Sequence, residues 1–203
     1  MDIYELKKRA KEGDFVAQYE LGCCYQQGQF VKKDYKKANE WLEKSANQNY
    51  DKAYLALGQN YCAGRGVEQD YKRGLEFFLL SAEQGNSLAQ FLVGFCYEQE
   101  NGVEFDEKQV MFWYTKSAEQ GYYLAQFNLG VWYEIKQDYK KAFYWWKKSA
   151  EQGYNYAQKN VACCYQEGEG VPQNLEKAKY WYTKLAEQGD EEAIEMLKKL
   201  EEE

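Results

Sequence analysis

The sequence of 203 residues contains no histidine and only one proline. The absence of histidine excludes the commonest general base, the serine–histidine–aspartate triad and every zinc site with an imidazole ligand. A single proline is typical of a chain with long uninterrupted helices, because proline breaks the interior of a helix. These absences exclude many familiar hydrolase and metalloenzyme sites and predict a mostly helical protein.

An excess of positive charge and long apolar runs are also missing. Lys and Arg number 26 against 33 Asp and Glu, and a formal net charge of −7 gives little attraction to phosphate backbones or anionic lipid. The longest apolar stretches, such as 77–80 and 110–114, are far shorter than the roughly 20 residues that cross a bilayer. The first residues lack the apolar segment of a secretory signal. We expect no nucleic-acid partner, no membrane insertion and a cytoplasmic location, or a secreted or periplasmic one if a signal peptide has been removed.

The feature that is present throughout is an internal repeat. Gly22, Gly58, Gly94 and Gly130 follow one another at intervals of 36 residues, and a fifth copy has Ala162 at this position after 32 residues. Aromatic rings recur in the same register, and a period of this length is typical of one pair of helices. The recurring rings are Trp41, Phe77, Trp113, Trp145 and Trp181.

Each repeat reads as a first helix, a loop and a second helix. A short oxygen-bearing side chain stands before each second helix, where it can accept from free backbone N–H groups. These predicted N-caps are Asp34, Asp70, Asp106, Asp138 and Asn174. Residues that tolerate a positive φ follow the second helices. They are Asn49, Gly85, Gly121, Gly153 and Gly189.

The repeats resemble a known family. The residues that carry the resemblance are Ala53, Leu57, Gly58, Tyr61, Gly64, Gly66, Val67, Asp70 and Tyr71, and again Val171, Pro172, Asn174, Ala178, Trp181, Tyr182, Ala186, Glu187, Gln188 and Gly189. This pattern is similar to that of the Sel-one-like repeat, a relative of the tetratricopeptide repeat. The departures are Phe30 and Glu100 at loop glycine positions, Ala162 in a first helix, and a fourth loop that is shorter by four residues. The resemblance implies a right-handed superhelical α/α solenoid.

The predicted architecture is therefore all-α, with about five helical hairpins between a leading and a closing helix. We expect one domain over residues 1–203, because each hairpin of a solenoid contacts chiefly its neighbours. The predicted repeats are 14–49, 50–85, 86–121, 122–153 and 154–189, and the flanking helices are 2–12 and 190–201.

Six cysteines invite a disulfide or metal interpretation, and we expect neither. No C-x-x-C spacing occurs, and the adjacent pairs, Cys23 with Cys24 and Cys163 with Cys164, point about 100° apart on a helix. Some secreted relatives of the resembled family carry a cysteine in each helix of a repeat, whereas here the second helices carry alanine at positions such as Ala46 and Ala82. The sequence predicts six free thiols, no metal and no cofactor.

The residues that differ between repeats mark the candidate binding surface. They fall on one arc of each first helix, and the resemblance implies that first helices line the concave side. Amides beside exposed rings suit an extended peptide, because amides pair with its backbone and apolar side chains hold its side chains. The alternative is that the apolar members only pack between repeats. The predicted partner-binding residues are Gln59, Asn60, Leu92, Phe95, Gln99, Asn128, Val131, Trp132 and Asn160.

A repeat surface without a catalytic constellation indicates a non-enzymatic scaffold or adaptor. We expect a monomer that binds a protein or peptide on its concave face. One alternative is an immunity protein that occludes a toxin or enzyme. A second is the cell-wall or β-lactam-related activity associated with some secreted relatives, although a shared fold does not supply chemistry.

Overall fold

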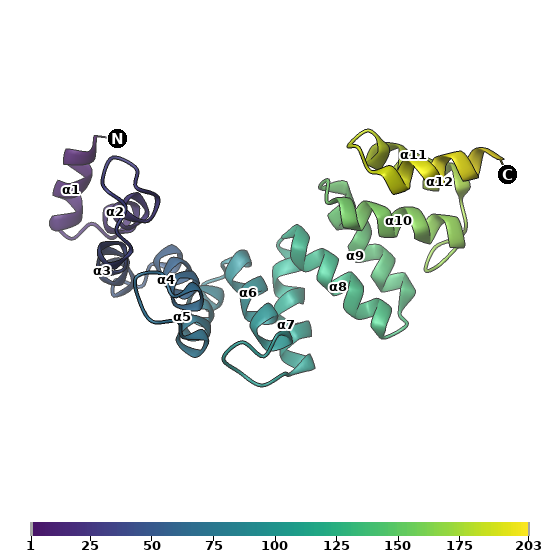
Figure 1. Ribbon diagram of the computed structural model, residues 1–203. Helices are drawn as coiled ribbons and strands as arrows, with labels where there is room; N and C mark the ends of the chain where they lie inside the picture. The colour runs from purple at the N-terminus through teal and green to yellow at the C-terminus, as the bar shows by residue number, and fades with distance from the viewer. Residues whose placement is uncertain (1, 203) are drawn as a thin grey trace. The chain divides into compact units, whose positions relative to one another are not determined.

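The computed structural model describes residues 2–202, and these form α-helices joined by turns, with no strand among them (Figure 1). The prediction of an all-α chain is confirmed, as is the order of a leading helix, five helical hairpins and a closing helix. The helices are α1 (Ile3–Lys11), α2 (Phe15–Gln27), α3 (Tyr35–Ala46), α4 (Asp51–Ala63), α5 (Tyr71–Glu83), α6 (Ser87–Glu98), α7 (Glu107–Glu119), α8 (Tyr123–Ile135), α9 (Tyr139–Glu151), α10 (Asn155–Glu167), α11 (Leu175–Ala186) and α12 (Glu191–Glu202).

The chain divides into two compact units, Met1–Trp113 and Tyr114–Glu203, called unit 1 and unit 2 below. Unit 1 holds α1 to α6 and the first part of α7, and unit 2 holds the rest of α7 and α8 to α12. The division falls inside a helix and not in a flexible linker. That residues 1–203 form one domain stays a prediction.

The second helix of every hairpin begins at the predicted cap. Asp34, Asp70 and Asn174 each accept from the backbone N–H three residues later, at distances of 2.9 to 3.1 Å. Asp106 accepts from the N–H groups of both Lys108 and Gln109, and Asp138 accepts from the N–H of Lys141. All five predicted N-caps are confirmed, because each side chain supplies an acceptor for the unpaired donors of a first turn.

The turns keep a left-handed backbone even where glycine is replaced. Gly66 has a φ of +73°, and a Cβ added there would lie 2.5 Å from the carbonyl carbon of Tyr35, so this turn packs directly on α3. Phe30, at the equivalent place in the first repeat, has a φ of +63°, and its side chain is 67% exposed. Glu100 likewise has a φ of +56°. These departures change the side chain at the turn and not the path of the backbone.

A buried glutamine joins four of the five first helices to the helix before it, whereas the second repeat has Tyr54 at this position. The Nε2 group of Gln18 donates to the carbonyl oxygen of Ala10, and Gln90 donates in the same way to Ala82, both at 3.1 Å. Within unit 2, Gln126 and Gln158 repeat this bond to the carbonyls of Ala118 and Ala150. A buried amide that lacks a partner costs stability, so each bond fixes a first helix against the helix before it.

Candidate functional site

The predicted binding residues lie at very different depths. In unit 1, Gln59 on α4 and Gln99 after α6 are exposed, Phe95 on α6 is 37% exposed, and Leu92 is half-buried. In unit 2, half-buried positions on α8 and α10 are occupied by Asn128, Val131, Trp132 and Asn160.

Asn60 lies in the interior, so the prediction that it contacts a partner is wrong. Its side chain is 1% exposed, and its Nδ2 group donates to Oδ1 of Asn39 at 2.7 Å. Asn39 is itself 4% exposed and donates to the carbonyl oxygen of Arg65 at 2.9 Å. Asn60 falls on the variable arc of the helix, but packing of α3 against α4 covers it.

Two of the unit 2 residues take part in internal packing. Val131 packs against the buried cluster that contains Val161, Trp146 and Ala142. The Nδ2 group of Asn128 donates to the hydroxyl oxygen of Tyr114 at 3.2 Å. The packing alternative therefore applies to Val131, whereas contacts of the unit 2 residues with a partner stay a prediction.

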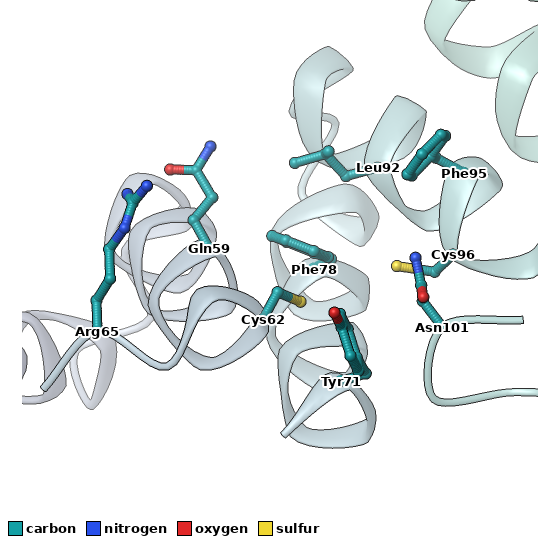
Figure 2. A pocket seen from close by; sticks show the side chains of 9 residues that line it. All are labelled: Gln59, Cys62, Arg65, Tyr71, Phe78, Leu92, Phe95, Cys96 and Asn101. Atoms are coloured by element: carbon teal, nitrogen blue, oxygen red, sulfur yellow. The ribbon is translucent and has the colours of Figure 1, made fainter. Parts of the chain in front are cut away.

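In unit 1, three of the predicted residues are brought together around one cavity. Gln59, Leu92 and Phe95 share it with residues that the sequence did not single out, and its volume is about 420 Å³. We call it the α4–α6 cavity, because its lining comes from α4, α5, α6 and the turns after α4 and α6 (Figure 2). The lining residues are Gln59, Cys62, Arg65, Tyr71, Phe78, Leu92, Phe95, Cys96 and Asn101.

The apolar part of the α4–α6 cavity depends on a close approach of two helices. The ring of Phe78, which is 3% exposed, lies against α4 at Gly58, where an added Cβ would be 2.5 Å from the ring. Leu92 packs on the same buried cluster as Phe78. The ring of Phe95 stacks on Phe91, with centroids 6.2 Å apart. A buried floor and two partly exposed side walls give the cavity a hydrophobic interior.

Two thiols line the same cavity, and both are held in the protonated form. Figure 2 shows the sulfur atoms of Cys62 and Cys96 pointing toward each other across the cavity. Burial, and to a smaller extent the neighbouring Cys62, raises the pKa of the Cys96 thiol to about 12. Burial, followed by the charge of Asp70, raises the pKa of the Cys62 thiol. A nucleophilic cysteine needs a lowered pKa, so these thiols have the character of packing groups.

The rim of the α4–α6 cavity is polar. Gln59 and Arg65 lie on one side of the view in Figure 2, and Leu92 and Phe95 lie on the other. The hydroxyl oxygen of Tyr71 accepts from Nε2 of Gln69 at 2.9 Å, and the same Nε2 donates to the carbonyl oxygen of Cys62 at 2.8 Å. The rim therefore offers a guanidinium and amides around an apolar centre, which is the composition of a binding pocket.

Sequence reasoning missed the members of the cavity that come from the turns and the second helix. Arg65 and Asn101 stand at the same position in two successive turns, where the other long turns have Gln29 and Glu169. This variation was a readable signal, because turn positions without a structural duty are free to carry function. Tyr71 and Phe78 gave no such signal, because aromatic residues also stand at their positions in other repeats, such as Tyr139 and Trp146.

Alkylation should distinguish the cysteines by depth. All six are free thiols in the structure; Cys163 is exposed, whereas Cys96 and Cys164 are buried, with pKa values raised by burial to about 12. At pH 8 a thiol of pKa 12 is a thiolate for about one part in 10⁴, so N-ethylmaleimide should label Cys163 first and Cys96 and Cys164 last. Labelling of the buried pair should rise about tenfold per pH unit while the fold persists.

Peptide mass spectrometry of timed samples measures these rates. In denaturant without reductant, all six thiols should react rapidly, which controls for disulfides. Labelling of Cys96 at the rate of Cys163 in the folded protein would contradict the burial of the cavity floor.

Two further features bear on the class of protein. No helix among the described residues has both the length and the apolar character needed to span a bilayer. Within the same residues, no group of three or more Cys, Asp or Glu side chains is placed to hold a metal ion.

Comparison with known proteins identifies the repeats. The family model of the Sel1 repeat matches residues 16–50, 51–86, 87–122, 124–154 and 155–190. All of these boundaries agree with those of the predicted repeats to within two residues.

Solved structures share both sequence and fold with the chain. The protein c5321, described as a protective antigen present in uropathogenic Escherichia coli strains, is 34% identical, with a TM-score of 0.93 over 97% of this chain and 43% of that protein. A Sel1 repeat protein from Oxalobacter formigenes is 33% identical, with a TM-score of 0.88 over 97% of this chain and 58% of that one. The chain thus spans about half the length of these two relatives.

A more distant likeness concerns the fold alone. The immunity protein Pa5087 from Pseudomonas aeruginosa is 20% identical, with a TM-score of 0.56 over 92% of this chain and 73% of that protein. The five matches of the repeat model cover nearly the whole of residues 16–190, and the two closer structures share the fold over 97% of the chain. This chain belongs to the Sel1 repeat family.

Proposed function

We propose that the chain is a non-enzymatic interaction module that captures a segment of a partner protein, and that the α4–α6 cavity holds a side chain of that segment. Sel1 repeat proteins generally mediate protein–protein interaction. The observation that carries the proposal is a cavity of about 420 Å³ whose walls, Leu92 and Phe95, are specific to one repeat. The other first helices carry residues such as Glu20 and Gln59 at these two positions.

The chemistry of the cavity favours binding over catalysis. Its nine lining residues include no carboxylate, and both thiols have raised pKa values. General acid–base catalysis requires a group that titrates near the working pH. The lining supplies hydrophobic surface, amides and one cation, and these groups support recognition of a peptide.

The inhibitor alternative has less support. The likeness to an immunity protein of Pseudomonas aeruginosa concerns the fold, and no residue of the α4–α6 cavity comes from that comparison. An inhibitor that occludes a folded enzyme would use a broad surface, whereas a concave pocket with an apolar floor fits a single inserted side chain. Peptide capture is therefore the preferred function.

Replacing Phe95 by alanine should abolish most of the binding without unfolding the protein. A library of random linear peptides displayed on phage would be selected on the immobilised chain, and one selected peptide would be measured by fluorescence polarisation. Truncation of an aromatic contact at the centre of an interface commonly costs about 2 kcal/mol, so Kd should rise about 30-fold. Phe95 is partly exposed, and circular dichroism should show the same melting curve to within a few degrees.

Phe15 offers a matched control. Its ring is 40% exposed against 37% for Phe95, and it belongs to unit 1 but contacts Tyr50 and does not line the cavity. Phe15→Ala should therefore leave the affinity unchanged. Selected peptides that bind Phe95→Ala as tightly as the parent would place the binding surface elsewhere, and the α8 variants Asn128→Ala and Trp132→Ala would then test unit 2.

A further inference from the structure

The α4–α6 cavity carries one uncompensated charge at its rim. Arg65 is exposed, and its guanidinium forms no ion pair with any residue that the structure describes. Among the lining residues of the cavity, Arg65 is the one with a charged side chain. A cation beside an apolar pocket selects its partner, because the partner must offer an apolar group to the pocket and a negative charge to the cation at the same time.

The carbonyl group of Arg65 is held by a buried amide pair. The N–H of Arg65 donates to the main-chain carbonyl oxygen of Asn60 at 2.9 Å, a bond that the equivalent turns share, and the carbonyl oxygen of Arg65 accepts from Nδ2 of Asn39 at 2.9 Å. Asn60 donates in turn to Asn39 at 2.7 Å, and both amides are buried. The turn that carries the guanidinium is therefore held at the edge of the cavity before any partner arrives.

This arrangement is particular to one place in the chain. The next repeat has Leu75 and Cys96 at the positions of Asn39 and Asn60, and its turn carries the neutral Asn101 in place of Arg65. Buried amides at these positions are not needed for the fold, because the other repeats form the same hairpin without them. The two amides hold the turn that carries Arg65, and a contact group held in place before binding loses less freedom when a partner binds.

We propose that the α4–α6 cavity binds an extended peptide segment that places a bulky apolar side chain between Phe78, Leu92 and Phe95 and an aspartate or glutamate against Arg65. This inference rests on the proposed function and names the chemistry of the partner. The amides of Gln59 and Asn101 are placed at the rim to pair with the backbone of that segment. The net charge of −7 opposes acidic peptides in general, so the acidic residue is recognised at one point and not by a long-range field.

A specificity exchange tests the role of Arg65. The same phage library would be selected in parallel on the wild-type chain and on Arg65→Glu, and the enriched sequences would be compared. The wild-type pool should combine Leu, Phe or Trp with a nearby Asp or Glu, whereas the Arg65→Glu pool should keep the apolar residue and exchange the acid for Lys or Arg. For one wild-type peptide, replacing its acid by the corresponding amide should raise Kd about 10- to 100-fold.

Arg73 provides the control for a change of charge alone. It belongs to the same unit, is exposed and lies over the ring of Tyr61 with 4.5 Å to the centroid, but it does not line the cavity. Arg73→Glu removes and adds the same charges as Arg65→Glu. The peptides selected on Arg73→Glu should match those selected on the wild-type chain.

The outcomes separate this inference from the proposed function. Suppose that the selected peptides need Phe95 for binding but that the pool selected on Arg65→Glu still contains the acidic residue. This result would overturn the inference and leave peptide capture intact. A pool with no dependence on Phe95 would overturn both. If 3-phenylpropionate displaced the selected peptide as effectively as the unlabelled peptide does, the site would be one for small carboxylates. If the chain alone formed a dimer in sedimentation that Phe95→Ala abolished, the occupant would be a second copy of the chain. Either result would overturn the inference.

Discussion

Replacing Trp146 by alanine should lower the free energy of unfolding by about 3 to 5 kcal/mol, the range measured when a large buried side chain is removed. The side chain of Trp146 is 3% exposed and belongs to the buried cluster of unit 2 with Val161 and Leu185. Its indole ring lies against the backbone of α8 at Gly130. The cavity left by truncation therefore opens between α8 and α9, where Trp146 contacts Gly130.

The measurement is equilibrium unfolding in urea followed by circular dichroism. Tyr144 is the matched control, because it lies on the same helix and is 50% exposed. Tyr144→Ala should cost less than about 1 kcal/mol, as is usual for surface positions. Trp146→Phe should cost less than Trp146→Ala, because a phenyl ring fills part of the cavity and the buried indole N–H has no hydrogen-bond partner among the described residues to lose. A loss below about 1 kcal/mol for Trp146→Ala would contradict the packing described for unit 2.

Replacing Gly58 by alanine should lower the free energy of unfolding by about 1 to 3 kcal/mol, which is the usual cost of overpacking a well-filled core. An added Cβ would lie 2.5 Å from the ring of Phe78 and 3.0 Å from the carbonyl oxygen of Gly74. Relief would require α4 and α5 to separate, because one of the two neighbours is backbone. The higher helix propensity of alanine, about 1 kcal/mol, offsets only part of this cost.

The fifth repeat supplies the control for Gly58. Ala162 occupies the equivalent position there and is fully buried. Ala162→Gly should lower the free energy of unfolding by about 1 kcal/mol or more, through lost helix propensity and a lost buried methyl group. Glycine should thus be the more stable residue at position 58 and alanine the more stable residue at position 162. A gain in stability for Gly58→Ala would show that α4 and α5 are packed less closely than the structure has them.

The turns and helix ends were predictable because their causes are local. An aspartate such as Asp34 caps a helix by contacting an N–H group three residues away, and this contact needs no knowledge of the rest of the chain. Asn49 could be assigned in the same way, since a positive φ after a helix depends on the residue itself, and the structure gives it a φ of +62°.

The binding surface was only partly predictable because burial on a helix is decided by its neighbours. Gln59 and Asn60 are adjacent on the predicted arc, yet one is exposed and the other is 1% exposed. The difference comes from Asn39, 21 residues earlier, which receives a hydrogen bond from Asn60. A helical projection gives the direction in which a side chain leaves the axis of its own helix. It does not show which other helix or turn packs over that side chain.

By itself the sequence determined the repeated helical hairpins, their caps, the shortened fourth loop and the membership of a repeat family, since each of these follows from periodic contacts between residues close in the chain. Only the tertiary structure decided that Phe78, Cys62 and Cys96 form the interior of one cavity and that Arg65 stands at its rim. The physical reason is that the cavity is the space left where three helices and two turns fail to fill the volume between them. That volume depends on the distance between α4 and α5, which the contact of Phe78 with Gly58 sets.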